Sequence, residues 1–143
     1  MKRVDINTCQ PRAYQAMLGL EQYLSNSKID AALRELIRVR ASLINKCHFC
    51  IAMHAGAAER LGVPKEKITA LAHWQDSKLF NDQERAALAM TDAMTKISEG
   101  GVSDEVYGRA ATFYADEEMV QLIILISTIN AWNRIGVSTA GGE

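Results

Sequence analysis

The helical spacing of the apolar residues constrains this chain more than any other feature of its sequence. From position 11 almost to the C-terminus, apolar side chains recur three and four residues apart, which places them on one face of an α-helix. No stretch shows the alternation of apolar and polar residues that is typical of a half-buried strand. Proline, which interrupts helix interiors, occurs only twice. The pattern therefore predicts an all-α fold.

Residues that start and stop helices divide the chain into segments. Pro11 suits an early helical position, and Gly62 suits a helix end. Asn81, Ser103 and Asp116 are candidate N-caps. The expected helices span 11–25, 30–44, 47–61, 64–73, 83–98, 103–113 and 116 through 132. A chain of 143 residues has the length of one domain. We therefore expect 1–143 to form a single domain, a compact bundle of about six to seven helices.

The apolar positions of three helices indicate the core. The helix at 30–44 is expected to turn these residues inward: Leu33, Leu36, Ile37, Val39 and Ile44. The first helix is expected to contribute these: Tyr14, Met17, Leu18 and Leu20. The last helix is apolar nearly all round in its middle, so we expect it to be buried in the core or in a subunit interface.

Charge and composition argue against several classes of partner. The chain has 16 basic and 17 acidic residues, and the basic residues are scattered. Such a surface lacks the positive footprint that binds nucleic acids or anionic membranes. The longest apolar run, Leu122 to Ile126, is too short to span a bilayer, and no apolar signal segment follows the N-terminus. We therefore expect a cytoplasmic protein without a nucleic-acid or membrane partner.

The chemistry is concentrated in residues 47–54, whose sequence is CHFCIAMH. Because helix residues three, four and seven apart share a face, Cys47, Cys50 and His54 lie along one stripe. Cys47 stands at or just before the helix start, where the helix dipole and free N–H groups favour a thiolate. Two cysteines one turn apart can close a disulfide, and we expect Cys47 and Cys50 to form one within the chain. A thiolate here can also be oxidised by peroxide to a sulfenic acid and resolved by its neighbour.

Glu35 and His54 are the candidate proton-transfer groups. Glu35 lies on the preceding helix, twelve residues before Cys47, and points back at the cysteines if the two helices form a hairpin. Its carboxylate could then orient His54 or accept a proton through water. His54 is four residues from Cys50 but seven from Cys47. We therefore expect Cys50 to meet the peroxide and Cys47 to resolve the product.

Other interpretations of these residues remain open. The cysteine pair could be core packing, or a zinc ion could be held by the two cysteines, His54 and Glu35. Structural zinc sites usually draw on a second cysteine pair, which this chain lacks. Haem attachment is excluded because Ile51, not histidine, follows Cys50. We expect neither a metal nor another cofactor.

We expect structural rather than chemical roles for the remaining cysteine, the other histidines and the aromatic residues beside them. His48 points away from the cysteine stripe, so we expect it to be exposed or in an interface. Phe49 is expected to pack, and Cys9 to be a small buried or surface residue near a loose terminus. His73 and Trp74 follow a short helix and are interpreted as packing or as the wall of a pocket.

Together these residues resemble the core motif of a known family. Glu35 followed by Cys47-x-x-Cys50-x-x-x-His54 resembles the motif of the AhpD-like alkylhydroperoxidases, in the single-core branch of the carboxymuconolactone decarboxylase superfamily. The resemblance covers roughly 15–137. Outside the motif it rests on these residues: His73-Trp74 with Ser77 and Phe80, residues 84–89 with Thr91-Asp92, and residues 129–134.

The resemblance implies a fold, an assembly and an activity. It implies an all-helical homo-oligomer, a trimer or a hexamer, that reduces a peroxide for antioxidant defence. The electrons come from a dithiol donor such as a thioredoxin-like or lipoyl protein. Cys50 resembles the peroxide-attacking cysteine, Cys47 its disulfide partner, and Glu35 with His54 the proton relay. The best-known member has a histidine where this chain has Phe49, so part of that relay is missing or rerouted.

Two other functions remain open. The first is a decarboxylase-type enzyme that uses His54 and Glu35 as acid and base on a lactone acid. Decarboxylase members of the superfamily generally lack the cysteine pair, so its presence here argues against that activity. The second is a non-enzymatic redox sensor or binding protein, an oligomer whose disulfide only switches assembly.

Overall fold

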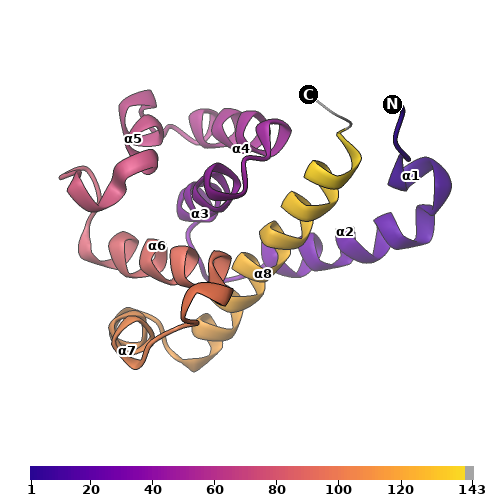
Figure 1. Cartoon of the computed structure of the whole chain (residues 1–143). Helices are drawn as coiled ribbons and strands as arrows, with labels where there is room; N and C mark the ends of the chain where they lie inside the picture. The colour runs from indigo at the N-terminus through magenta and orange to yellow at the C-terminus, as the bar shows by residue number, and fades with distance from the viewer. Residues whose placement is uncertain (141–143) are drawn as a thin grey trace.

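The computed structural model describes residues 1–140, and in that part of the chain every regular element is helical (Figure 1). The predicted all-α fold is confirmed. The elements, with η for a 3₁₀ helix, are α1 (Ile6–Cys9), α2 (Pro11–Ser25), α3 (Ala31–Asn45), α4 (His48–Arg60), α5 (Lys65–Ala70), η1 (Leu71–Asp76), α6 (Asp82–Thr95), η2 (Ile97–Glu99), α7 (Asp104–Phe113) and α8 (Asp116–Thr139).

Helix starts match the prediction best where a side chain caps the helix. Side-chain oxygens of Asp30, Asn81 and Ser103 accept backbone N–H bonds at the starts of α3, α6 and α7. Asp116, expected to be an N-cap, is instead the first residue of α8. The Glu118 carboxylate there accepts the backbone N–H of the capping residue, at position 115.

Four other features differ from the prediction. α1 has four residues, which is too short for a periodic pattern to reveal it. The helix expected at 64–73 is divided into α5 and η1, where His73 has non-helical backbone angles. The helix expected at 83–98 ends at Thr95 and is followed by the short η2, whereas α8 continues beyond Trp132 to Thr139.

α3 is the centre of the packing and contacts α4, α6 and α8 (Figure 1). Its inward residues supply two hydrophobic clusters. The larger cluster joins α3, α6 and α8 through residues that include Leu33, Ile37, Met90, Leu122 and Ile126. The smaller joins α3, η1 and α6 through residues that include Leu36, Val39, Leu71, Trp74 and Leu88. The predicted core of α3 is thus confirmed, apart from Ile44, which is half-buried.

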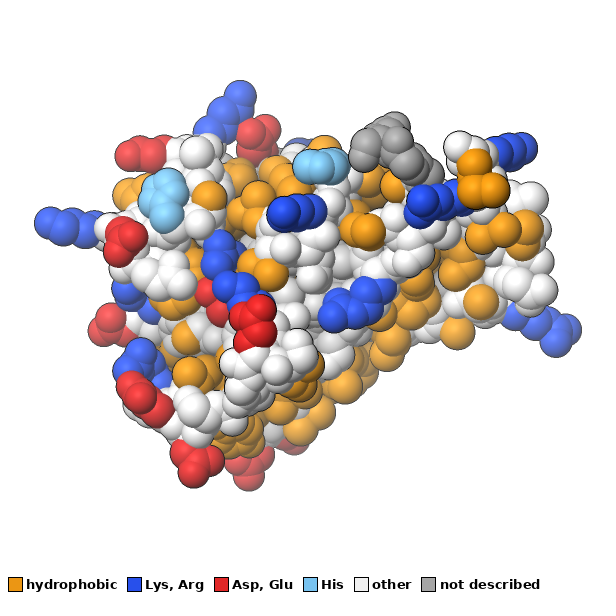
Figure 2. All heavy atoms as spheres, in the orientation of Figure 1, with side chains coloured by type: hydrophobic (Ala, Val, Ile, Leu, Met, Phe, Trp, Pro, Cys, Tyr) orange, Lys and Arg blue, Asp and Glu red, His pale blue; other side chains and the backbone are white. Residues whose placement is uncertain are grey.

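α2 extends along α8 and leaves much of its surface uncovered (Figure 1). Leu18 and Leu20 were expected in the core but are 43% and 38% exposed. That expectation is wrong for the single chain, because Leu18 and Leu20 are not on the side of α2 that faces α8. Tyr14 and Leu24 mark that side: Tyr14 meets the Trp132 ring edge-on, with centroids 5.8 Å apart, and Leu24 is completely buried. Figure 2 shows hydrophobic side chains along the edge that α2 forms.

α8 is the core helix that its composition predicts. By length and composition alone, it is the one helix among the described residues that could cross a membrane. In this fold Leu122, Leu125 and Ile126 are completely buried, and α3 and α6 pack against the helix. Its C-terminal half positions the candidate site.

Candidate active site

The turn between α3 and α4 brings Cys47 and Cys50 together. α3 ends at Asn45, Lys46 has a left-handed φ of 55°, and the Cys47 N–H donates to the Ser42 carbonyl at 3.1 Å. Cys47 is then the N-cap of α4, and Cys50 lies in its first turn. The two form a disulfide, as their spacing predicts, with Cα atoms 5.3 Å apart. Both residues are buried, at 3% and 6% exposed.

Gly136 of α8 covers the disulfide. A Cβ at this position would lie 2.9 Å from the Cys47 Sγ and 3.5 Å from the Cys50 Sγ. Any larger residue would therefore overlap the sulfur of Cys47. This role was not expected from the sequence, although a glycine inside a long apolar helix is a known signal of close packing.

Three amide side chains hold the turn against α8. The Asn45 side-chain amide donates to the side-chain oxygens of Asn130 and Asn133, each at 2.9 Å. Asn133 in turn donates to the Ser42 hydroxyl at 2.9 Å, and both residues are completely buried. Because buried polar groups are costly unless they are paired, this network fixes the end of α3 relative to α8. It thereby fixes the position of Cys47 beneath Gly136.

His54 and Glu35 form the second half of the site. α3 and α4 pack as the expected hairpin, and His54 Nδ1 lies 2.8 Å from Glu35 Oε2. Both side chains are largely buried, at 16% and 14% exposed. His54 and Cys50 are four residues apart in α4 and so share a face. Among the residues that the structure describes, no hydrogen bond joins the His54 ring to either sulfur of the disulfide.

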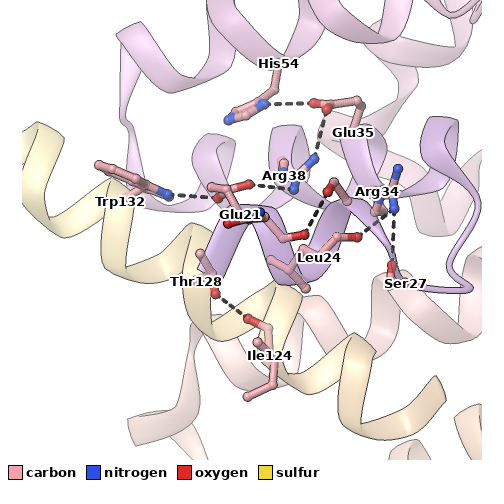
Figure 3. A network of polar contacts seen from close by, with 12 residues as sticks. Glu21, Leu24, Ser27, Arg34, Glu35, Arg38, His54, Ile124, Thr128 and Trp132 are labelled. Atoms are coloured by element: carbon pink, nitrogen blue, oxygen red, sulfur yellow. Dashed lines mark hydrogen bonds and ion pairs between the residues drawn. The ribbon is translucent and has the colours of Figure 1, made fainter. Parts of the chain in front are cut away.

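A chain of polar contacts continues from Glu35 to α8 (Figure 3). Arg38 Nη1 donates to Glu35 Oε1 and Arg38 Nη2 donates to Glu21 Oε2, each at 2.9 Å. The other oxygen of Glu21 accepts the Trp132 indole N–H at 2.9 Å. None of these three partners was expected from the sequence to take part in the site. The i,i+3 spacing of Glu35 and Arg38 was the only local signal.

These contacts determine which atom of the His54–Glu35 pair donates in their hydrogen bond. Burial raises the pKa of the Glu35 carboxyl, but the His54 hydrogen bond and the Arg38 charge lower it by more, so its pKa lies below the usual value. An ionised Glu35 can only accept, so His54 Nδ1 carries the hydrogen of their bond. In the neutral imidazole, Nε2 is then the proton acceptor.

The other residues considered from the sequence lie outside this arrangement. His48 is exposed, as expected, and Cys9 is an exposed free thiol. Phe49 was expected to pack, but it is 72% exposed because it faces away from α3 and α8. Trp74 is buried and donates its indole N–H to Asp92 at 3.1 Å, whereas His73 is exposed.

Other surface features of this part of the chain lie apart from the cysteines, Glu35 and His54. Within residues 1–140 no group of three or more His, Cys, Asp or Glu side chains is arranged to hold a metal ion. A surface hollow of about 250 Å³ lies between Leu33, Asn81 and Tyr114. It includes none of the cysteines and neither Glu35 nor His54. The cysteines, Glu35 and His54 lie on α3 and α4, and Gly136 of α8 packs against the disulfide.

Known proteins are similar to this chain in sequence and in fold. The model of the "Carboxymuconolactone decarboxylase family" matches residues 11–93. The uncharacterized protein YdfG of Bacillus subtilis (strain 168) is 35% identical over 137 residues, 96% of this chain and 93% of YdfG.

Two solved structures extend the comparison. The first is a protein of unknown function from Agrobacterium tumefaciens, described as a candidate AhpD antioxidant defence protein. It matches with a TM-score of 0.95 and 34% identity, over 100% of this chain and 98% of that one. The debrominase Bmp8 matches with a TM-score of 0.81 and 26% identity, over 92% of this chain and 71% of Bmp8. The family match, extended over nearly the whole length by YdfG and the Agrobacterium structure, establishes that this chain belongs to the carboxymuconolactone decarboxylase family and has its AhpD-like all-α fold.

Proposed function

We propose that this chain is a thiol-dependent peroxidase with Cys47 and Cys50 as its redox-active pair and Glu35 and His54 as its proton relay. The observation that carries the proposal is that the cysteine pair and the Glu35–His54 pair lie on the same helical hairpin, formed by α3 and α4. The disulfide lies at the start of α4, and the His54–Glu35 hydrogen bond joins α4 to α3 one turn further along. A thiol at a helix start beside a histidine base is an arrangement that activates a nucleophile.

The first half of the reaction oxidises Cys50. In the dithiol form, His54 Nε2 takes the Cys50 thiol proton, and Glu35 stabilises the resulting imidazolium. The thiolate attacks one oxygen of the peroxide, the O–O bond breaks, and a sulfenic acid forms on Cys50. The imidazolium returns its proton to the departing alkoxide, which leaves as an alcohol. Two electrons pass from the sulfur to the peroxide.

The second half closes and then reopens the disulfide. Cys47 gives up its thiol proton and attacks the sulfenic sulfur of Cys50; the S–S bond forms, the S–O bond breaks, and the departing hydroxide takes up a proton and leaves as water. An external dithiol, of a thioredoxin-like or lipoyl protein, then reduces the disulfide by thiol–disulfide exchange and is itself oxidised. In the closed disulfide the two Cα atoms are 5.3 Å apart, within the usual range for a disulfide.

We also propose that the chain acts as a homo-oligomer, a trimer or a hexamer. Large apolar side chains are exposed on α2 and α4: Leu18, Leu20, Tyr23, Phe49 and Met53. Isolated exposed apolar residues are ordinary, but groups on neighbouring turns favour burial against a second copy.

Reductive dehalogenation is a second candidate function. It is favoured by the likeness to debrominase Bmp8, and one structure in that comparison is a Bmp8 variant with 2,3,4-tribromopyrrole, 25% identical to this chain with a TM-score of 0.82. The same dithiol supplies the two electrons required. The C–Br bond is replaced by C–H, bromide leaves, and Cys47 and Cys50 become a disulfide.

A turnover assay tests the proposed function. The reduced protein is mixed with excess cumene hydroperoxide and dithiothreitol, and peroxide loss is followed; 2,3,4-tribromopyrrole with bromide detection forms a parallel arm. We expect catalytic peroxide loss that Cys50→Ser abolishes. With a sulfenic-acid trap, Cys47→Ser should be labelled at Cys50.

The alternatives predict other results. Bromide release without peroxide turnover would favour the dehalogenase. A single oxidation of the cysteines without turnover would favour a redox sensor. If a lactone acid is supplied as substrate and is still consumed by both serine variants, the result would favour a decarboxylase.

A further inference from the structure

Arg38 is a buried cation that two carboxylates share. Its side chain is 9% exposed, and its two terminal nitrogens donate to Glu35 and to Glu21, each at 2.9 Å. A buried charge is costly unless it is paired and hydrogen-bonded. Because a guanidinium is planar and its donors are fixed in direction, these two bonds also fix where both carboxylates lie.

The two oxygens of Glu35 have separate partners. Oε1 accepts from Arg38, and Oε2 is 2.8 Å from His54 Nδ1. With Oε1 held by Arg38, the carboxylate cannot turn away from the imidazole without breaking a charge-assisted hydrogen bond. Figure 3 shows Glu35 between the two, with the second nitrogen of His54 on the side away from Glu35.

The net charge of the cluster becomes zero when it takes up one proton. The charged groups that face one another are Glu35 and Arg38 from α3, Glu21 from α2 and His54 from α4. With a neutral imidazole, these four side chains carry one net negative charge, and with an imidazolium they carry none. Without Arg38, the carboxylates of Glu35 and Glu21, which are 14% and 31% exposed, would lose the cation that both contact.

The outer end of the cluster lies on the helix that covers the disulfide. Glu21 accepts the Trp132 indole N–H at 2.9 Å. Trp132 and Gly136 are four residues apart in α8 and therefore share a face. Arg38 thus connects the histidine–carboxylate pair to the helix that holds Gly136 against the two sulfurs.

We propose that Arg38 is a positioning residue, whose guanidinium fixes Glu35 so that His54 keeps its hydrogen on Nδ1 and presents Nε2 to Cys50. The proposal deepens the peroxidase function proposed above and rests on it for its consequence in catalysis. Arg38 touches neither the sulfurs nor the peroxide. It acts through Glu35.

Two substitutions separate the charge of Arg38 from its shape. Arg38→Met keeps much of the side chain and removes the charge, whereas Arg38→Lys keeps the charge but cannot hold both carboxylates in a planar fork. Arg34→Met is the matched control, because Arg34 lies on the same helix and bonds to Leu24 and Ser27 rather than to Glu35. If Arg38→Met does not fold, adding Glu21→Gln removes one negative charge as well.

The first readout needs no activity. NMR of protein carrying ¹³C-labelled glutamate side chains follows the Glu35 carboxyl as a function of pH. We expect its titration to move to higher pH in Arg38→Met, to stay closer to wild type in Arg38→Lys, and not to move in Arg34→Met. Unchanged titration in folded Arg38→Met would overturn the proposal, even if the wild-type protein consumes peroxide.

The second readout is the pH profile of Cys50 oxidation by hydrogen peroxide in a single turnover. A general base contributes roughly 10²- to 10⁴-fold, so loss of its positioning should slow Arg38→Met about tenfold near neutral pH and shift the acid limb upward. A uniform loss of rate with an unchanged profile would show a merely structural role. If the wild-type protein does not react with peroxide, the peroxidase function fails while the NMR titration still decides the role of Arg38.

Discussion

Gly136→Ala is the sharpest test of the packing around the disulfide. The added Cβ would lie 2.9 Å from the Cys47 Sγ, whereas non-bonded atoms of this kind rest about 3.5–4.0 Å apart. The overlap is thus roughly 0.6 Å or more, against a sulfur that the disulfide and the Asn45–Asn133 contacts hold in place. Overpacking of this kind costs about 1–3 kcal/mol. The higher helix propensity of alanine offsets up to about 1 kcal/mol of this loss of unfolding free energy.

Gly108→Ala supplies the matched control. Gly108 also lies inside a helix, α7, but nothing is within 4 Å of its added Cβ. This substitution should therefore gain up to about 1 kcal/mol of unfolding free energy from helix propensity alone. Urea unfolding of both oxidised variants should place Gly136→Ala about 1–3 kcal/mol below Gly108→Ala. Equal changes in the two would show that α8 does not press on the disulfide.

Three further predictions follow from the relay and the surface. His54→Ala and Glu35→Gln should each slow peroxide consumption by about 10²-fold or more while circular dichroism still shows a folded helical protein; unchanged rates would remove both from the relay. Because the pKa of Glu35 is lowered by its partners in the folded chain, its contribution to stability is present above its unfolded pKa. That contribution is lost as pH falls through the folded pKa, so wild type should lose more unfolding free energy on acidification than Glu35→Gln, as urea titrations at several pH values would measure. Leu20→Ser should weaken self-association in light scattering, and a wild-type monomer at micromolar concentration would contradict the oligomer.

Local signals in the sequence account for most of the fold. Capping side chains such as Asp30, Asn81 and Ser103 act within three residues of themselves, so a pattern along the chain reveals the helices that they start. The disulfide and the shared face of Cys50 and His54 are likewise consequences of helical spacing. These features can be predicted without knowing how the helices pack.

Contacts between distant segments were beyond such reasoning. Trp132 and Glu21 are 111 positions apart, and nothing in either segment indicates that α2 and α8 bring them together. Gly136 signals a close approach, but the group that approaches it is known only once α8 is seen to cross the cysteines. The predicted burial of Leu18 and Leu20 is wrong for a related reason. Their spacing shows that one face of α2 is apolar, but it does not show which neighbour covers that face.

The most direct test of the central claim is a single oxidation of the reduced protein. One equivalent of cumene hydroperoxide is added, the reaction is stopped within seconds, and the cysteines are mapped by mass spectrometry. We predict a loss of two hydrogens confined to the Cys47–Cys50 peptide, reversed by dithiothreitol. The exposed free thiol of Cys9 is the internal control and should remain reduced. Oxidation of Cys9 while Cys47 and Cys50 remain thiols would contradict the claim that the protein activates this pair for reaction with peroxide.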